Sequence, residues 1–170
     1  VHSYTLEVEE KRKLLGDDAA KHARISLAVP KGAKLEEFTA LTFLPDGNKI
    51  PVDAKSATIK DGRLTFDMPQ ATKGAVLAYR YKVYTRELEG LSQWPFQTQH
   101  PIVRSTFRMR LNTNTRLPFS FRSSHPSQQP HFDTKLRSSG DGEQFQWLVW
   151  TMKDLPAATD GHFATLQIGN

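Results

Sequence analysis

The chain has 170 residues, about the size of one domain, and a chain of this length buries about 70% of the surface that it exposes when unfolded. It contains no cysteine, which excludes a thiol nucleophile, a cysteine zinc site and a disulfide framework. Its 23 Lys and Arg against 18 Asp and Glu give a mild net charge of +5, and this dispersed excess argues against a nucleic-acid partner.

The sequence shows neither a membrane span nor a leader. No run approaches the ~18 consecutive apolar residues of a membrane-crossing helix, and Val1 opens directly into an alternating strand pattern. We therefore expect residues 1–170 to form one domain, taken from a longer multidomain chain by processing or excision.

Alternating apolar residues predict two strands at the start of the chain. They lie at 4–8 and 23–29, and Gly16-Asp17-Asp18 supplies turn chemistry between them. The pattern favours a long opening hairpin.

Two turn motifs organise the next part of the chain. A strand at 35–44 stops at Pro45-Asp46-Gly47, where Pro presets φ and Gly accepts a positive φ. Short strands are expected at 50–52 and 57–59, and Asp61-Gly62 is the two-residue connection that favours a type I′ hairpin.

Residues 75–84 have the period-2 pattern of a half-buried strand. One face carries Ala75, Leu77, Tyr79, Tyr81 and Val83, and the other carries Arg80, Lys82 and Tyr84. The length of the run predicts a central strand.

A second long alternating run follows the aromatic stretch that starts at Trp94, and the pair His100-Pro101 is expected to hold the chain extended ahead of it. The run places Val103, Ser105, Phe107, Met109 and Leu111 on one face, and Ile102, Arg104, Thr106, Arg108 and Arg110 on the other. Three arginines therefore share one face of the expected strand.

Three further alternating runs complete the pattern. They lie at 117–121, 132–136 and 145–149, between loops rich in Ser, Pro, Gln and Gly. No stretch longer than two turns keeps apolar residues at helical spacing. The chain is therefore predicted to be all-β, a two-sheet antiparallel β-sandwich.

Four landmarks follow one another along the chain. They are Leu44-Pro45-Asp46-Gly47 with a strand at 50–52, then Lys73-Gly74-Ala75-Val76-Leu77-Ala78-Tyr79-Arg80-Tyr81, then 96–103 with Pro101-Ile102-Val103, and then 150–157 with Leu155-Pro156-Ala157. In this order the chain resembles DUF3857, a bacterial domain of unknown function that precedes transglutaminase-like, papain-fold domains in exported or membrane-tethered proteins. The resemblance covers most of the chain, and its landmarks are structural rather than catalytic.

The resemblance implies a periplasmic or extracellular protein whose partner is an adjoining transglutaminase-like domain. Such a domain carries a catalytic Cys, His and Asp, in which the imidazole lowers the pKa of the thiol and the carboxylate orients the imidazole. Because this chain has no Cys, that catalytic half lies outside it. We expect neither enzymatic activity nor a cofactor in the segment itself.

Two groups of residues are candidates for binding. Arg104, Arg108 and Arg110 carry guanidinium forks suited to the carboxylates or phosphates of an anionic polymer or a neighbouring domain, although a solvated sheet face is the commoner role of such residues. Trp94 and Phe96 could form an aromatic platform for a sugar ring or a partner's side chain, although core or sheet-edge packing is commoner.

The region from 123 to 133 offers the remaining chemistry. His125, His131 and Asp133 could supply nitrogen and oxygen ligands, but their spacing in an irregular loop is no defined ligand pattern, so no metal site is predicted. Ser123 and Ser124 precede His125 without a converging carboxylate, which favours polar loop residues over a nucleophile.

Three hypotheses of function follow. The first is a noncatalytic accessory domain that positions a transglutaminase-like domain or recognises its substrate or a surface partner. The second is a free-standing module that binds a carbohydrate or another surface ligand through Trp94, Phe96 and the arginine face. The third, an enzyme built on His125, His131 and Asp133, rests only on the tendency of catalytic groups to lie on loops.

Overall fold

The computed structural model describes residues 3–112, 115–125, 127–158 and 163–169, which form thirteen strands and two short 3₁₀ turns. The strands are β1 (Tyr4–Lys13), β2 (Arg24–Ala28), β3 (Lys34–Phe43), β4 (Lys49–Pro51), β5 (Thr58–Lys60), β6 (Arg63–Asp67), β7 (Val76–Thr85), β8 (Gln93–Pro95), β9 (Ile102–Asn112), β10 (Phe119–Ser123), β11 (His131–Ser138), β12 (Gln144–Leu155) and β13 (Ala164–Ile168). The 3₁₀ turns are η1 (Ala19–His22) and η2 (Ala54–Ser56). Within these ranges no helix has the length and apolar character needed to span a bilayer.

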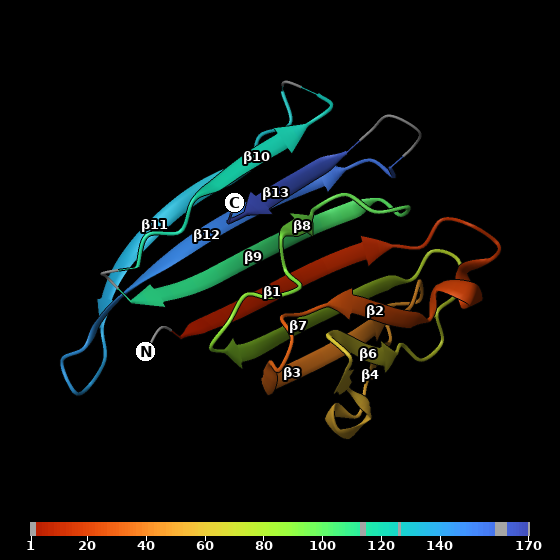
Figure 1. Cartoon of the computed structure of the whole chain (residues 1–170). Helices are drawn as coiled ribbons and strands as arrows, with labels where there is room; N and C mark the ends of the chain where they lie inside the picture. The colour runs from red at the N-terminus through yellow and green to blue at the C-terminus, as the bar shows by residue number, and fades with distance from the viewer. Residues whose placement is uncertain (1–2, 113–114, 126, 159–162, 170) are drawn as a thin grey trace.

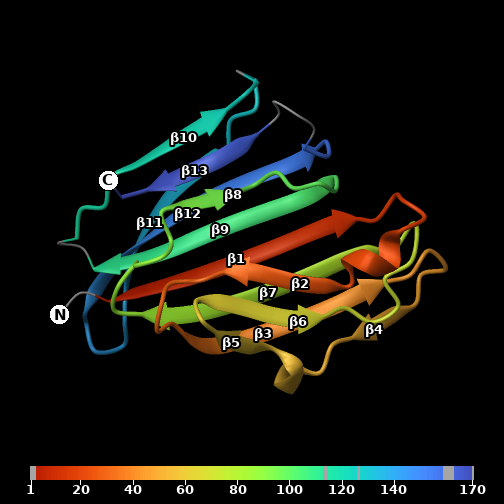
Figure 2. The same cartoon turned by 45° about the vertical axis from the view of Figure 1, so that its right-hand side comes forward.

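The strands form two layers (Figure 1). One layer is a seven-stranded antiparallel sheet in the order β11-β12-β9-β1-β7-β3-β4. The other layer consists of two three-stranded sheets, β10-β13-β8 and β2-β6-β5, which lie over one face of the large sheet (Figure 2). This arrangement confirms the predicted all-β antiparallel sandwich and adds that its second layer is divided. We call the covered face of the large sheet the inner face and the opposite face the outer face.

The predicted opening hairpin is wrong, because its two strands lie in different layers. β1 pairs with β7 and β9 in the large sheet, whereas β2 pairs with β6 in the second layer. After β1 the backbone N–H of Leu14 donates to the carbonyl of Ala75, and the chain then crosses to the second layer through η1. Alternation along a strand predicts which residues share a face, but it does not identify the partner strand.

Both predicted turns are confirmed. Asp61 and Gly62 have φ angles of 50° and 71° and connect the paired strands β5 and β6, as a type I′ turn requires. In the Pro-Asp-Gly turn between β3 and β4, Gly47 has a φ of 90°. The Asp46 Oδ1 atom accepts a hydrogen bond from the backbone N–H of Asn48 at 2.9 Å, which fixes the same turn.

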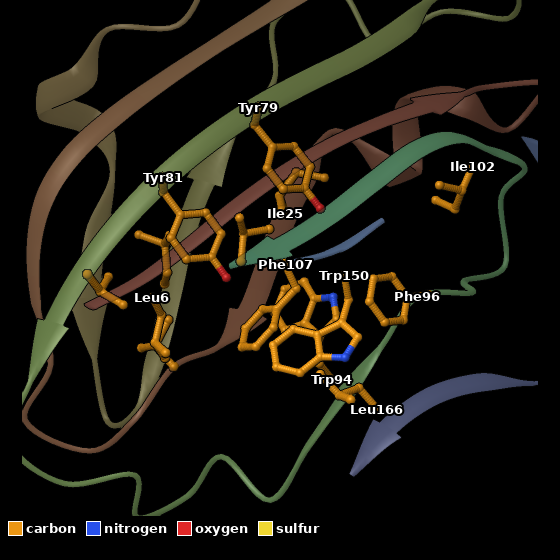
Figure 3. Packing of buried hydrophobic residues seen from close by; sticks show 14 of the residues in the cluster. Leu6, Ile25, Tyr79, Tyr81, Trp94, Phe96, Ile102, Phe107, Trp150 and Leu166 are labelled. Carbon is orange, nitrogen blue, oxygen red and sulfur yellow. The ribbon is translucent and has the colours of Figure 1, made fainter. Parts of the chain in front are cut away.

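The inner face of the large sheet supplies much of the hydrophobic core. The predicted central strand, β7, lies between β1 and β3. Its inner residues, at most 2% exposed, are Leu77, Tyr79, Tyr81 and Val83. Phe66 of β6 contacts Tyr79 with 5.4 Å between ring centroids. Trp94 of β8 stacks on Phe107 of β9 with 5.2 Å between ring centroids (Figure 3). Aromatic contacts therefore hold each half of the divided layer against the large sheet.

The alternation predicted for β9 holds from Arg104 onward and changes phase before it. A bulge in the pairing of β1 with β9 places Lys11 opposite Arg104 and Arg12 opposite Ile102, so Val103 is the extra residue. Ile102 is consequently 1% exposed and Val103 is 41% exposed, the reverse of the prediction. The three predicted arginines remain together on the outer face.

The later strands follow the predicted runs, with two additions. β11 and β12 cover the runs at 132–136 and 145–149, and β10 overlaps the run at 117–121 but starts and ends two residues later, whereas β8 and β13 are absent from the sequence prediction. β8 has three residues and ends at Pro95, which weakens its strand signal. The buried residues at the centre of β12 are Leu148, Trp150 and Met152. Trp147 and Val149 therefore lie on the outer face of the large sheet.

Candidate functional site

The most polar part of the interior is a network around Glu10 of β1. Glu10 is 2% exposed, and its Oε1 atom accepts hydrogen bonds from the Tyr79 hydroxyl at 2.6 Å and from Arg12 Nε at 2.9 Å. The Arg12 Nη2 group also contacts this oxygen, and it donates to the Tyr79 hydroxyl at 2.7 Å. Ser105 donates to the other carboxylate oxygen at 3.5 Å. The buried carboxylate is thus paired with a cation and bonded by two hydroxyl groups.

This network shifts the titration of its neighbours. Burial, followed by the negative charge of Glu10, raises the pKa of Tyr79 and of Tyr81 above the ordinary value of 10.0. Burial opposes the charge on Arg12, but Tyr79 and Glu10 outweigh it and raise the Arg12 pKa. Both phenols therefore stay neutral while Arg12 stays charged. Because Glu10 and both tyrosines are at most 2% exposed, the network is closed to a substrate and serves the packing of the sandwich.

His100 and His22 form a second polar contact, close to Arg12. Their rings meet edge to face with 4.2 Å between centroids, and His22 Nε2 lies 3.5 Å from Asp18 Oδ2. Burial lowers the pKa of His100, the charges of His22 and Arg12 lower it further, and Asp18 acts in the opposite direction. Among the described residues, His100 Nε2 has no hydrogen-bond partner. The imidazole of His100 is therefore neutral at pH 7.

The outer face of the large sheet holds the three predicted arginines, and two of them have partners there. Arg108 Nη1 lies 2.6 Å from Glu7 Oε1 on β1, and Arg80 of β7 approaches the same oxygen at 2.9 Å. Arg110 covers the ring of Phe145, with 3.8 Å between its guanidinium carbon and the ring centroid. Arg108 and Arg110 are thus engaged within the sheet.

Arg104 has a different environment. The strand register places Lys11 of β1 on one side of it and Lys153 of β12 on the other. In the part of the chain that the structure describes, none of these three cations lies within 4.0 Å of a carboxylate. Arg104 Nε is buried and has no hydrogen-bond partner there. We call Lys11, Arg104 and Lys153 the cationic row.

A groove of about 430 Å³ runs along the outer face over β9, β12 and β11. Arg104 and Arg108 contribute to it from β9, and Lys135 and Arg137 contribute from β11. The strand between them supplies the half-buried Trp147. This groove places an aromatic side chain among cations, an arrangement that suits a ligand with both apolar surface and negative charge.

The expected aromatic platform of Trp94 and Phe96 is not on the surface. Trp94 is 4% exposed and Phe96 is fully buried, and Figure 3 shows both rings within the core. Neither ring therefore offers a free face to a sugar or to a partner. Trp147, which is half-buried on the outer face, lies in the groove with Arg104 and Arg108 instead. It belongs to the alternating run at 145–149, but only the register of β12 against β9 places it there.

The histidines considered as metal ligands do not form a cluster. Across the described ranges, no group of three or more His, Asp and Glu side chains could hold a metal ion. His131 and Asp133 lie on the outer face of β11 and line the groove, and Asp133 Oδ2 lies 3.3 Å from Lys135 Nζ. His125 is exposed in the preceding loop. The chemistry of His131 and Asp133 therefore belongs to the groove.

The two serines of the same region organise the loop. The Ser124 hydroxyl donates to the carbonyl of Phe163 at 3.4 Å and accepts from the backbone N–H of that residue at 3.0 Å. The Ser123 hydroxyl accepts from the backbone N–H of His125 at 3.1 Å and donates to Gln128 at 3.4 Å. Both hydroxyl groups thus fix local backbone, in agreement with the role as polar loop residues.

The fold and these surfaces define a β-sandwich domain with a closed polar interior and an open, charged outer face. The family model of a domain of unknown function with a solved structure, DUF3857, matches residues 2–159, so the chain belongs to the DUF3857 family. The landmarks that predicted this membership are the turn between β3 and β4, the strand β7, the entry into β9 and the end of β12. No curated protein and no solved structure matches the chain.

Proposed function

We propose that this chain is a noncatalytic domain of an exported bacterial protein, which positions a transglutaminase-like domain or recognises its substrate or a surface partner. The main support is the distribution of charge. The buried Glu10, Arg12 and Tyr79 satisfy one another away from solvent, whereas the outer-face groove is open and has uncompensated cations. Such a surface is suited to binding a ligand or a partner rather than to catalysis.

The catalytic residues belong, in this proposal, to the adjoining domain. Transglutaminase-like chemistry needs a thiolate activated by an imidazole, and this chain has no Cys that could supply it. The rigid seven-stranded sheet is a suitable support, since recognition surfaces are most precise on regular strands.

The proposal is tested by comparing acyl-transfer and peptide-hydrolysis rates for the 170-residue chain and for the natural gene product that contains it. The expected result is activity in the longer protein that disappears when its catalytic Cys is replaced by Ser, and none in the chain alone. Robust turnover by residues 1–170 alone contradicts the proposal. Reading the gene on both sides of the segment establishes beforehand whether a Cys, His and Asp set adjoins it.

A second candidate, a free-standing module for a carbohydrate or another surface ligand, is favoured by Trp147 in the groove. Its half-buried ring lies on the outer face, where a flat ligand can pack against it. A glycan array probed with the chain and with Trp147→Ala tests this candidate. Signals that vanish in the variant support it, and a blank array contradicts it.

Export to the periplasm or the extracellular space is a further part of the proposal. Fractionation of the native host, followed by immunodetection of the protein, tests it directly. The protein is expected in the periplasmic or extracellular fraction, and its recovery with the cytosol contradicts this localisation.

A further inference from the structure

The cationic row crosses three neighbouring strands of the outer face. Lys11 and Lys153 each lie directly opposite Arg104 in the strand register. Side chains in directly opposite positions have Cβ atoms about 5 Å apart, and like charges there are destabilising. The fold therefore places three like-charged residues at neighbouring positions, and among the described residues no carboxylate lies within 4.0 Å of any of them.

Several other charges of the outer face are compensated by carboxylates. Glu7 takes both Arg108 and Arg80, and Lys82 lies 3.1 Å from Glu37. An anion placed over the cationic row would provide the missing compensation. The row thus has the electrostatic character of an anion-binding surface.

The groove extends from this row to Trp147. Six positions along β12 separate Trp147 from Lys153, which is roughly 20 Å at about 3.3 Å per residue. Arg104 lines the groove near one end and Trp147 lines it near the other. An occupant that contacts both ends is therefore a chain of several units and not a single small anion.

We propose that the groove and the cationic row bind an acidic polysaccharide. Its carboxylates lie over Arg104 and the two lysines, because guanidinium groups bind carboxylates through paired hydrogen bonds. One of its sugar rings packs its apolar C–H surface against the indole of Trp147. This inference deepens the recognition role proposed above and names the class of ligand, and it does not require the adjoining domain to be present.

The charge of the groove distinguishes this ligand from other polyanions. Asp133 lines the groove beside Lys135, and the whole chain carries only +5. Nucleic acids, with a phosphate at every nucleotide, bind to more strongly basic surfaces. A polyglutamate chain offers carboxylates but no ring for Trp147. A polymer that combines sugar rings with carboxylates matches both ends of the groove.

Calorimetric titration of the 170-residue chain with polygalacturonate tests the proposal, with neutral dextran as the uncharged control. Polygalacturonate is expected to bind at least about tenfold more tightly than dextran, a difference of about 1.4 kcal/mol. Its affinity is expected to fall as salt is added, because exposed charges are screened. Polyglutamate and single-stranded DNA, titrated in the same buffer, are expected to bind more weakly than polygalacturonate.

Two variants address the two ends of the groove. Arg104→Gln and Trp147→Ala are each expected to weaken polygalacturonate binding by about tenfold. Arg122→Gln is the matched control, since it removes an exposed arginine from β10 in the other layer, and it should leave the affinity unchanged. If Arg104→Gln does not fold, Lys153→Gln, at an exposed position of the same row, takes its place.

Several results overturn the proposal. They are the absence of polygalacturonate binding, an equal loss of affinity in Arg104→Gln and Arg122→Gln, and tighter binding of polyglutamate or single-stranded DNA. None of them depends on acyl transfer. Turnover by the chain alone would refute the accessory role and leave groove binding intact, whereas a silent titration would refute the groove ligand and leave the accessory role intact.

Discussion

Charged side chains are paired differently on the two faces of the seven-stranded sheet, and consecutive residues of β1 show the difference. On the inner face, Glu10 and Arg12 are bonded to each other and to Tyr79. On the outer face, Lys11, which lies between them in the sequence, is next to Arg104. Within the described residues no carboxylate lies within 4.0 Å of either cation, so these two charges are not compensated by the protein.

The difference follows from the cost of moving charge away from water. An unpaired charge in the interior lowers the stability of a protein by several kcal/mol, and removing one partner of a buried ion pair costs about 3–5 kcal/mol. Charged side chains on the inner face therefore need partners of opposite charge. On an exposed face, water screens neighbouring charges, and a pair contributes only about 0–1 kcal/mol. Repelling cations are therefore tolerated only where solvent, and hence a ligand, can reach them.

Replacing the inner carboxylate is expected to give the largest effect. Glu10→Ala leaves Arg12 buried without its counter-charge and should lower the free energy of unfolding by about 3–5 kcal/mol. Glu9→Ala, one residue earlier on the outer face, is the matched control, with an expected change within about 0.5 kcal/mol. Urea denaturation measures both, and a small, similar loss in the two variants would remove the distinction between the faces.

A pair of tryptophan variants sharpens the same comparison. Trp94→Ala removes a ring that is stacked on Phe107 in the core and should cost about 3–5 kcal/mol of stability. Trp147→Ala, at a half-buried position of the outer face, should cost about 1 kcal/mol while weakening polygalacturonate binding. Thermal unfolding and the titration described above check both. Weaker polygalacturonate binding by Trp94→Ala without any loss of stability would contradict this comparison.

His100 should make stability depend on pH. Its pKa in the folded protein is lowered by burial and by the charges of His22 and Arg12, so the unfolded chain binds the proton more readily. Stability is then fully present above the unfolded pKa of about 6.5, and it is lost as the pH falls below that value. Unfolding midpoints in urea between pH 8 and about pH 5 measure this slope.

The variant His100→Gln removes the titrating group and should flatten that part of the profile. His131→Gln, at an exposed position of β11, is the control and should keep the slope of the parent protein. A slope that persists unchanged in His100→Gln assigns the pH dependence to other groups.

The smallest expected effect comes from the cationic row. Arg104→Gln relieves the repulsion from Lys11 and Lys153 and should stabilise the protein by about 0.5 kcal/mol at low salt. The gain should disappear at high salt, where the charges of the parent protein are screened. Thermal unfolding at two salt concentrations, with Arg122→Gln beside it, measures the difference. If Arg104→Gln is less stable than the parent protein at both salt concentrations, the expected repulsion between Arg104 and the two lysines is contradicted.

Local features of the fold could be predicted because local chemistry determines them. The Asp61-Gly62 turn requires two positive φ angles, and residues 75–84 alternate without interruption, so both were predictable from a few neighbouring residues. The partner of β1 could not be predicted in this way. Alternation is satisfied equally by pairing with β2 or with β7 and β9, and the choice depends on how the whole core assembles.

The candidate site was only partly predictable for the same reason. The pattern predicted that Arg104, Arg108 and Arg110 lie on one face, and in the structure they do. It did not predict the bulge at Val103, since a bulge depends on the neighbouring strand. Trp147 was missed as well, because its place in the groove arises from the register between β12, β9 and β11, to which residues far apart in the sequence contribute.

The most direct test of the outer face as the recognition surface uses the three tryptophans of the chain as reporters. Their indole N–H signals can be followed by NMR while polygalacturonate is added, with Trp147→Phe identifying the signal from the groove. The account predicts a progressive shift of the Trp147 signal, with those of the buried Trp94 and Trp150 almost unchanged. A titration that leaves Trp147 unmoved, or that shifts the buried tryptophans instead, would contradict it.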